Sequence, residues 1–249
     1  MGRGEGTVGG SLLAGLDGVV RVLLPVSCPG CGCPDVVVCP SCRHRVLSGP
    51  ALHRILVDGT PAVASASWRG PAAGLVGGLK ERGRTDVLDV LAAALARAVA
   101  LLLWPAEGGP RHDAGPPVPP VLPGAGGPVL LVPPPATWRA VVRRRDRPGE
   151  RLAGHAADRL RRAGADVVAV PALALRRRVV DQAGLGRVAR EQNLTGAHRL
   201  RPGLGGVVAG RDVVVVDDVV TSGATAVEAG ATLRAAGARV VGTASVAHA

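Results

Sequence analysis

The sequence contains no phenylalanine and no tyrosine, and its only aromatic side chains belong to Trp68, Trp104 and Trp138. A core without phenyl rings has to be filled by smaller residues, so the hydrophobic content of 47% is mostly valine, leucine and alanine. This composition suits valine-rich buried strands packed against helices of alanine and leucine. Three tryptophans also offer few surfaces for base stacking, which is sparse for a protein that binds single-stranded nucleic acid.

Lysine is almost absent as well, because Lys80 is the only one, and arginine carries nearly all of the positive charge behind the net charge of +11. A basic surface of this size attracts anions such as phosphorylated metabolites, nucleic acid or an anionic membrane face. A coding bias toward alanine, glycine, arginine, valine and proline would explain the same charge. The charge alone therefore does not identify a partner.

Long uninterrupted hydrophobic runs are also lacking. The apolar stretch 11–26 is interrupted by Asp17 and Arg21, where a signal peptide needs a continuous apolar segment, and its spacing predicts an amphipathic helix within residues 1–25. The later stretch 91–104 contains Arg97 and is too short to cross a bilayer. We therefore expect no membrane span and a cytoplasmic protein, in which thiols stay reduced.

All five cysteines lie in the fifteen-residue segment CPGCGCPDVVVCPSC. Four of them form two C-x-x-C pairs, which are Cys28 with Cys31 and Cys39 with Cys42. Two hairpin-like turns of this kind can place four thiolates at the corners of a tetrahedron, as a closed structural zinc site requires. A redox pair is the alternative, although one C-x-x-C would suffice for it. The spacing predicts a zinc ribbon over residues 26–47, with Cys33 left over and His44 as an alternative ligand.

Beyond the ribbon, hydrophobic periodicity predicts alternating strands and helices over residues 60–249. Strands that alternate with helices form a parallel sheet covered on both faces, and ligands of such sheets bind where strands end and helices begin. Proline and glycine dominate residues 105–128, which predicts a loop. The expected strands are 60–68, 129–133, 166–175, 212–217 and 238–247, and the expected helices are 70–84, 85–103, 150–164 and 224–237.

The segment VVVVDDVVTSGAT joins four valines to two adjacent carboxylates and then to a turn of small residues. The strand should carry Asp217 and Asp218 to its carboxyl end, beyond the buried valines. The following turn opens a helix, whose free N–H groups and positive dipole end can hold a phosphate. Its residues are Thr221, Ser222, Gly223, Ala224 and Thr225, of which the glycine allows close backbone approach.

Two carboxylates beside a phosphate cradle would repel a bare phosphate, so the ligand has to offer them something else. Carboxylates accept hydrogen bonds from ribose hydroxyls and hold magnesium through water, and a phosphorylated ribose therefore fits both halves of the segment. An acidic cap at a strand-to-helix turn is the structural alternative, although one aspartate would provide it. A dinucleotide fold is disfavoured, because no G-x-G-x-x-G follows a predicted strand and no G-K-[ST] occurs.

These residues resemble the phosphoribosyl-diphosphate signature of type I phosphoribosyltransferases, with Ser222 where threonine is commoner. Together with the four-cysteine segment in front, the chain resembles the ComF family of competence-associated, phosphoribosyltransferase-like proteins. Three further segments are similar to elements of that family: GLKERGR, LVPPPATWRAVVRRRD, and DQAGLGRVAREQNLTGAH with Gln182, Leu185, Arg190 and Asn193. One departure is RRRDRPGERLA, where the family usually has Arg-Gly-aromatic.

The resemblance implies a type I phosphoribosyltransferase-like α/β fold, with a parallel sheet flanked by helices behind a small N-terminal zinc ribbon. It implies that Asp217 and Asp218 carry the catalytic role and hold the ribose hydroxyls and hydrated magnesium of 5-phosphoribosyl 1-diphosphate, while residues 221–225 hold the 5′-phosphate. Phosphoribosyl transfer needs a site that excludes water. Weaker candidates are Lys80 and Arg145 for the pyrophosphate side, and Arg190 and Asn193 for a mobile cover or a helix cap.

Two classes of function remain open at this point. The protein is either an enzyme that transfers phosphoribose to an unknown acceptor, or a binding protein of DNA uptake or nucleotide sensing that keeps the pocket without turnover. The resemblance implies a link to competence and single-stranded DNA or DNA-uptake proteins, with which the basic charge is compatible. No obvious general base lies beside the motif, and the sequence does not identify the acceptor.

Overall fold

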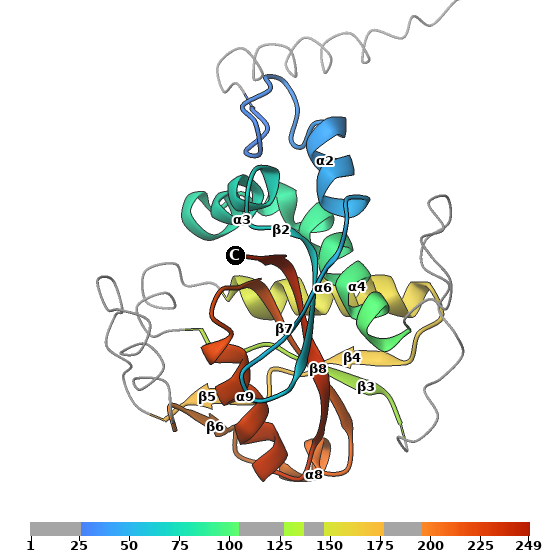
Figure 1. Ribbon diagram of the computed structural model, residues 1–249, viewed down its shortest axis with the longest axis vertical. Helices are drawn as coiled ribbons and strands as arrows, with labels where there is room; N and C mark the ends of the chain where they lie inside the picture. The colour runs from blue at the N-terminus through green and yellow to red at the C-terminus, as the bar shows by residue number, and fades with distance from the viewer. Residues whose placement is uncertain (1–25, 105–126, 137–146, 177–195) are drawn as a thin grey trace, which may run out of the picture.

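The computed structural model describes residues 26–104, 127–136, 147–176 and 196–249. The helix expected within residues 1–25 and most of the loop expected over 105–128 lie outside these ranges. Within these ranges, helices surround one central sheet (Figure 1). None of the described helices is long and apolar enough to cross a membrane.

The central sheet has six strands in the order β1-β2-β8-β7-β3-β4. All neighbouring pairs are parallel except β1 and β2, which form an antiparallel hairpin at one edge. The predicted mostly parallel sheet is therefore confirmed. Its strands are β1 (Leu52–Ile55), β2 (Pro61–Ser67), β3 (Val129–Val132), β4 (Val167–Ala169), β7 (Asp212–Val220) and β8 (Arg239–His248).

Helices cover both faces of this sheet, as expected (Figure 1). Strand residues alternate between the faces, so Val214 and Val216 of β7 pack with one set of helices while Val213 and Val215 pack with the other. The first set is α3 (Pro71–Arg82), α4 (Leu88–Leu103) and α6 (Pro148–Arg162), with the 3-10 turn η1 (Thr85–Val87) before α4. The second set is α8 (Gly205–Val208) and α9 (Ala224–Ala235).

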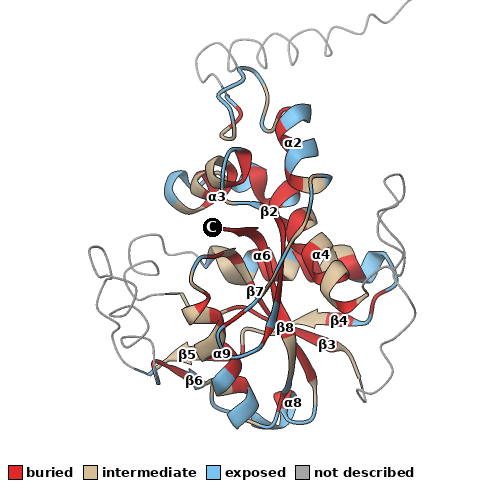
Figure 2. Cartoon of the chain, in the orientation of Figure 1, coloured by how far each residue is buried: buried red, intermediate tan, exposed pale blue. Residues whose placement is uncertain are grey.

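The residues of these layers that face one another are buried (red in Figure 2). They are almost all alanine, valine and leucine, as the lack of phenyl rings requires. Helix α4 is the clearest case, because eleven of its sixteen residues are buried and all of them are alanine, leucine or valine. Such a helix is apolar almost all round and can only lie inside the molecule. Trp68 and Trp104 are partly buried and pack against the same core.

The segment 166–175, which we expected as one strand, is divided into two. Pro171 lies in its middle and has no N–H to donate to a neighbouring strand. The first half is β4 of the central sheet, while the second half, β5 (Leu173–Leu175), pairs with β6 (His198–Leu200) in a separate two-stranded antiparallel sheet.

Strand β1 was not predicted, because its sequence Leu-His-Arg-Ile shows no clear apolar pattern. The hairpin to β2 nevertheless has a local signal in the pair Asp58 and Gly59, since Gly59 has a φ of 81° and the carboxylate of Asp58 accepts hydrogen bonds from the N–H and hydroxyl of Thr60. Asp-Gly between two strands is a typical hairpin turn.

The cysteine segment is attached to this domain by helix α2 (Pro40–Leu47). Val46 of α2 is buried in the main core, and its carbonyl accepts a hydrogen bond of 2.8 Å from Ser65 Oγ on β2. Arg97 of α4 donates one hydrogen bond of 2.8 Å to the carbonyl of Ser65 and another of 2.8 Å to the carbonyl of Gly49. The segment is thus fixed against the sheet and α4.

Candidate functional site

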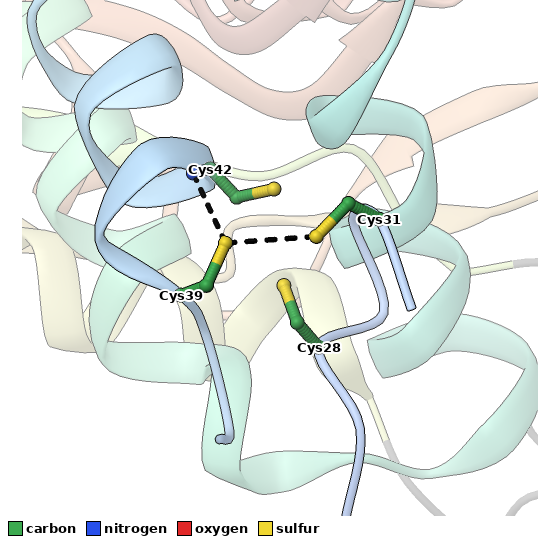
Figure 3. A group of neighbouring side chains, drawn as sticks. All are labelled: Cys28, Cys31, Cys39 and Cys42. Atoms are coloured by element: carbon green, nitrogen blue, oxygen red, sulfur yellow. Dashed lines mark hydrogen bonds between the residues drawn. The ribbon is translucent and has the colours of Figure 1, made fainter. Parts of the chain in front are cut away.

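The four cysteines of the two C-x-x-C pairs lie together, as predicted (Figure 3). Their Sγ atoms are all within 4.8 Å of one another, and those of Cys31 and Cys39 are 3.6 Å apart. A tetrahedral zinc site with Zn–S bonds of about 2.3 Å places its sulfurs about 3.8 Å apart, so this spacing fits the ion. His44 and the exposed Cys33 do not belong to the group.

The second C-x-x-C pair does not form the hairpin-like turn that we expected. Cys39 is the N-cap of α2, and its Sγ accepts a hydrogen bond of 3.4 Å from the N–H of Cys42. Pro40 follows at the first helical position, where its missing N–H costs nothing. The pair therefore opens a helix. Cys28 and Cys31 do lie in a hairpin-like turn, which is closed by an antiparallel bridge between Ser27 and Pro34 and by a hydrogen bond of 2.8 Å from the N–H of Cys28 to the carbonyl of Cys33.

The pKa values of the Cys28 and Cys42 thiols are shifted in opposite directions. Burial disfavours the thiolate of Cys28, but hydrogen bonds from the backbone of Cys39 and Gly30 and from neighbouring thiols lower its pKa to about 7. Burial and the neighbouring sulfurs raise the pKa of Cys42. A divalent metal would remove this conflict by binding all four thiolates, and it would then have no open position for a substrate. The group is suited to a structural metal.

The acidic pair lies inside strand β7, not at its end. β8 continues to pair with β7 beyond the carboxylates, as far as Val220 opposite His248. Asp218 is only 4% exposed, so our expectation that both carboxylates lie outside the core is wrong for this residue. The reason is helix α3, whose Lys80 places its Nζ 2.6 Å from Asp218 Oδ1 and supplies the charge that such burial requires.

Asp217 has a different environment from its neighbour. It is half-buried opposite Ser245, and its Oδ1 accepts a hydrogen bond of 2.8 Å from the N–H of Asp218. In the described parts of the chain it has no ion pair of its own. Burial and the charge of Asp218 raise the pKa of Asp217 to about 7, although the charge of Lys80 opposes this. Asp217 is thus the carboxylate that is ready to accept a further donor or cation.

The turn after β7 leads directly into helix α9 without a side-chain cap. Gly223 is the N-cap residue with a φ of 85°, and the N–H of Ala224 makes only a long contact of 3.4 Å to Ser222 Oγ. The first N–H groups of the helix therefore remain available, at the positive end of its dipole. This is the arrangement that binds phosphate.

Gly223 is required by its surroundings as well as by a ligand. A Cβ atom there would lie 2.7 Å from Cδ2 of Leu56, just after β1, and the positive φ disfavours any other residue. Replacing Gly223 would therefore disturb the packing of the β1–β2 hairpin. It is not a clean test of phosphate binding.

The structure places Asp217, Asp218, Lys80 and residues 221–225 near one another, around the last residues of β7 and the start of α9. Arg145, Arg190, Asn193, Gln182 and Leu185 lie outside the described residues. Sequence reasoning missed Arg54 of β1, whose Nη2 donates a hydrogen bond of 2.6 Å to the carbonyl of Thr221. The Asp-Gly turn could have revealed β1, but no local signal shows where its side chains point.

Residues 146–249 match the family model of the phosphoribosyl transferase domain. This part of the chain is similar to a phosphoribosyl transferase domain. The match contains Asp217, Asp218 and the turn into α9, and with the sheet and its helices it confirms the predicted phosphoribosyltransferase-like fold behind a cluster of four cysteines. No curated protein matches the chain, and the narrower resemblance to the ComF family stays a prediction.

Proposed function

We propose that the protein binds 5-phosphoribosyl 1-diphosphate together with magnesium and transfers its phosphoribose to an acceptor. One observation supports this proposal most strongly. Asp217 and Asp218, two adjacent carboxylates with different partners, are followed within a few residues by the N-terminus of α9, which has no side-chain cap. This succession lies within the region similar to a phosphoribosyl transferase domain.

The two carboxylates have different roles in this proposal. Asp217 accepts hydrogen bonds from the ribose hydroxyls, and these donors favour its ionised form against the burial that raises its pKa. Asp218 pairs with Lys80 and lies beside the ribose, where a carboxylate stabilises the positive charge that develops as the diphosphate leaves. Magnesium supplies charge compensation to the leaving diphosphate, and the oxygen ligands of this pair fit such a hard cation.

The remaining contacts of the proposed ligand come from segments on either side of the sheet. Residues 221–225 hold the 5′-phosphate through backbone N–H groups and hydroxyls. Lys80, which pairs with Asp218, would bind on the diphosphate side, the role that the family resemblance implies for it. Arg145, Arg190 and Asn193 keep the roles that the family resemblance implies, on the pyrophosphate side and in a cover.

Isothermal titration with 5-phosphoribosyl 1-diphosphate tests the binding half of this proposal. We expect saturable binding that weakens when magnesium is left out, because the metal offsets repulsion between the diphosphate and two carboxylates. Absence of binding with magnesium present would overturn the proposal. Release of pyrophosphate on adding candidate acceptors tests turnover, and binding without any release would leave a ligand-binding protein.

The alternative function is a binding protein of DNA uptake in the cytoplasm, which the net charge of +11 favours. Against it, Trp68 and Trp104 pack on the core, so neither is a free platform for stacked bases. Affinity for single strands that falls steeply with salt and survives Asp218→Asn would support the alternative. Loss of strand binding in this variant would tie DNA to the ribose-phosphate site.

A further inference from the structure

Arg54 lies beside the candidate phosphate cradle and has no counter-ion in the part of the chain that the structure describes. It belongs to the β1–β2 hairpin and is far from residues 221–225 in the sequence, yet its Nη2 is 2.6 Å from the carbonyl of Thr221. Its Nε is buried and has no hydrogen-bond partner among the described residues, which also provide no ion pair for this side chain. Burial of this kind disfavours the charged guanidinium and lowers its pKa.

His248 is a second unsatisfied group at the same end of the sheet. It is 5% exposed and lies opposite Val220, the residue before Thr221. Its Nε2 is buried without a hydrogen-bond partner in the described parts of the chain. Burial and the positive charges of Arg54 and His53 lower its pKa to about 4, so the imidazole is neutral at physiological pH.

A buried polar atom without a hydrogen-bond partner lowers the stability of a folded protein, so folded proteins contain few such atoms. Here Arg54 of β1 contacts the carbonyl of Thr221, and His248 of β8 lies opposite Val220, the residue before it, and close enough to Arg54 to be affected by its charge. An anion bound at the turn would give the guanidinium its counter-charge and the imidazole its hydrogen-bond partner.

We propose that Arg54 and His248 extend the cradle at residues 221–225 into a site for a phosphate monoester dianion. The proposal rests on the proposed function and adds two residues that bind the 5′-phosphate from the hairpin side. Arg54 holds Thr221 with one N–H and offers its remaining N–H groups and its charge to the phosphate. His248 contributes one neutral hydrogen bond.

Substitutions of Arg54 and His248 can distinguish a role in ligand binding from a role in folding. Replacing Arg54 by methionine keeps the apolar length of the side chain and removes an unpaired charge. Replacing His248 by leucine removes a buried atom that lacks a partner. His248→Leu should not lower the stability of the ligand-free protein, and Arg54→Met should lower it little, because water can replace its hydrogen bond to the exposed Thr221. Both changes should lower affinity for a phosphate monoester.

The test compares ribose 5-phosphate with magnesium pyrophosphate as calorimetric probes of the full-length protein. We expect Arg54→Met to weaken ribose 5-phosphate about tenfold to a hundredfold and His248→Leu about threefold to tenfold, with pyrophosphate affinity unchanged in both. Arg54→Lys keeps the charge and should recover part of the loss. Arg162→Met, at the exposed end of α6, is the control for a lost charge elsewhere.

The outcomes distinguish this inference from the proposed function. If the wild type binds 5-phosphoribosyl 1-diphosphate but both variants bind ribose 5-phosphate as the wild type does, Arg54 and His248 are not phosphate ligands. The same follows if the variants lose affinity for both probes together with thermal stability, since that marks a structural role. If the wild type binds none of the three compounds, the proposed function itself is wrong.

Discussion

Adjacent aspartates in one strand have acquired different properties through their partners. Asp218 is almost fully buried and pairs with Lys80, whereas Asp217 is half-buried, has no ion pair within the described residues, and has a pKa raised to about 7. Two identical side chains can therefore serve two purposes. One anchors α3 to the sheet, and the other keeps its capacity for a ligand.

Asp217→Asn should change the pH dependence of stability. A raised pKa in the folded state means that folding favours the protonated carboxyl, so its contribution is complete below the unfolded pKa near 3.8 and is lost as pH rises through about 7. Asparagine does not ionise, and the variant should gain on the order of 2 kcal/mol over the wild type as pH rises across this window.

Thermal unfolding of both proteins from acidic to mildly alkaline pH measures that gain. Asp158→Asn, an exposed aspartate on α6 that pairs only with Arg161 at the surface, is the control and should show no comparable trend. A constant difference between Asp217→Asn and the wild type at all pH values would mean that folding does not change the pKa of Asp217.

Lys80→Met should destabilise the protein, because it leaves the carboxylate of Asp218 buried without its cation. Breaking a fully buried pair costs roughly 3–5 kcal/mol, and we expect about 2 kcal/mol here because Lys80 is partly exposed. The double variant Lys80→Met with Asp218→Asn should be more stable than Lys80→Met alone, as a double-mutant cycle by denaturant unfolding will show. Additive effects would contradict a direct pair.

At the scale of elements, helix α3 connects the cysteine cluster with the acidic pair. Its glycines form the contact with the first C-x-x-C turn, since a Cβ on Gly74 would lie 2.0 Å from the carbonyl of Pro29, and one on Gly78 would lie 3.3 Å from the Pro29 side chain. Lys80 on the same helix reaches Asp218. Helix α3 therefore contacts both the cysteine turn and the candidate site.

Gly74 and Gly77 provide a matched test of this contact within α3. Gly74→Ala should destabilise the protein by about 1–3 kcal/mol, because its methyl group has to displace the backbone of Pro29. Gly77 has free space around the same position, so Gly77→Ala should stabilise the helix by about 0.5–1 kcal/mol. Thermal unfolding compares the two. Equal effects would show that the turn does not pack on α3 in this way.

The cysteine cluster predicts about one zinc ion per chain, a stoichiometry that follows from four ligands to one tetrahedral ion. Cys39→Ser should lose the metal and destabilise the adjoining segment, because Cys39 also caps α2. Cys33→Ser is the control and should keep the metal, since Cys33 lies outside the cluster. Metal analysis of protein purified without chelators decides this, and zinc-free wild type would refute the site.

For the whole molecule, the sequence predicted those features that depend on local pattern. We could predict the buried strand β7 from its valines, helix α4 from its apolar spacing, and the turn into α9 from its small residues. Each of these depends only on the order of neighbouring residues. The burial of Asp218 was not, since it depends on Lys80, which is 138 residues away in the sequence. The contact of Arg54 with Thr221 spans 167 residues and was missed for the same reason.

The measurement that tests the central claim most directly is the affinity of Asp217→Asn for 5-phosphoribosyl 1-diphosphate in the presence of magnesium. The substitution preserves volume and removes a charge that ribose hydroxyls and hydrated magnesium need, so isothermal titration should show binding about tenfold to a hundredfold weaker than in the wild type. Thermal unfolding of the same sample should show equal or greater stability, because the raised pKa of Asp217 makes its charge unfavourable to the empty fold. Weaker binding in a protein of undiminished stability would support a ribose-phosphate site at the end of β7. Unchanged affinity would contradict it.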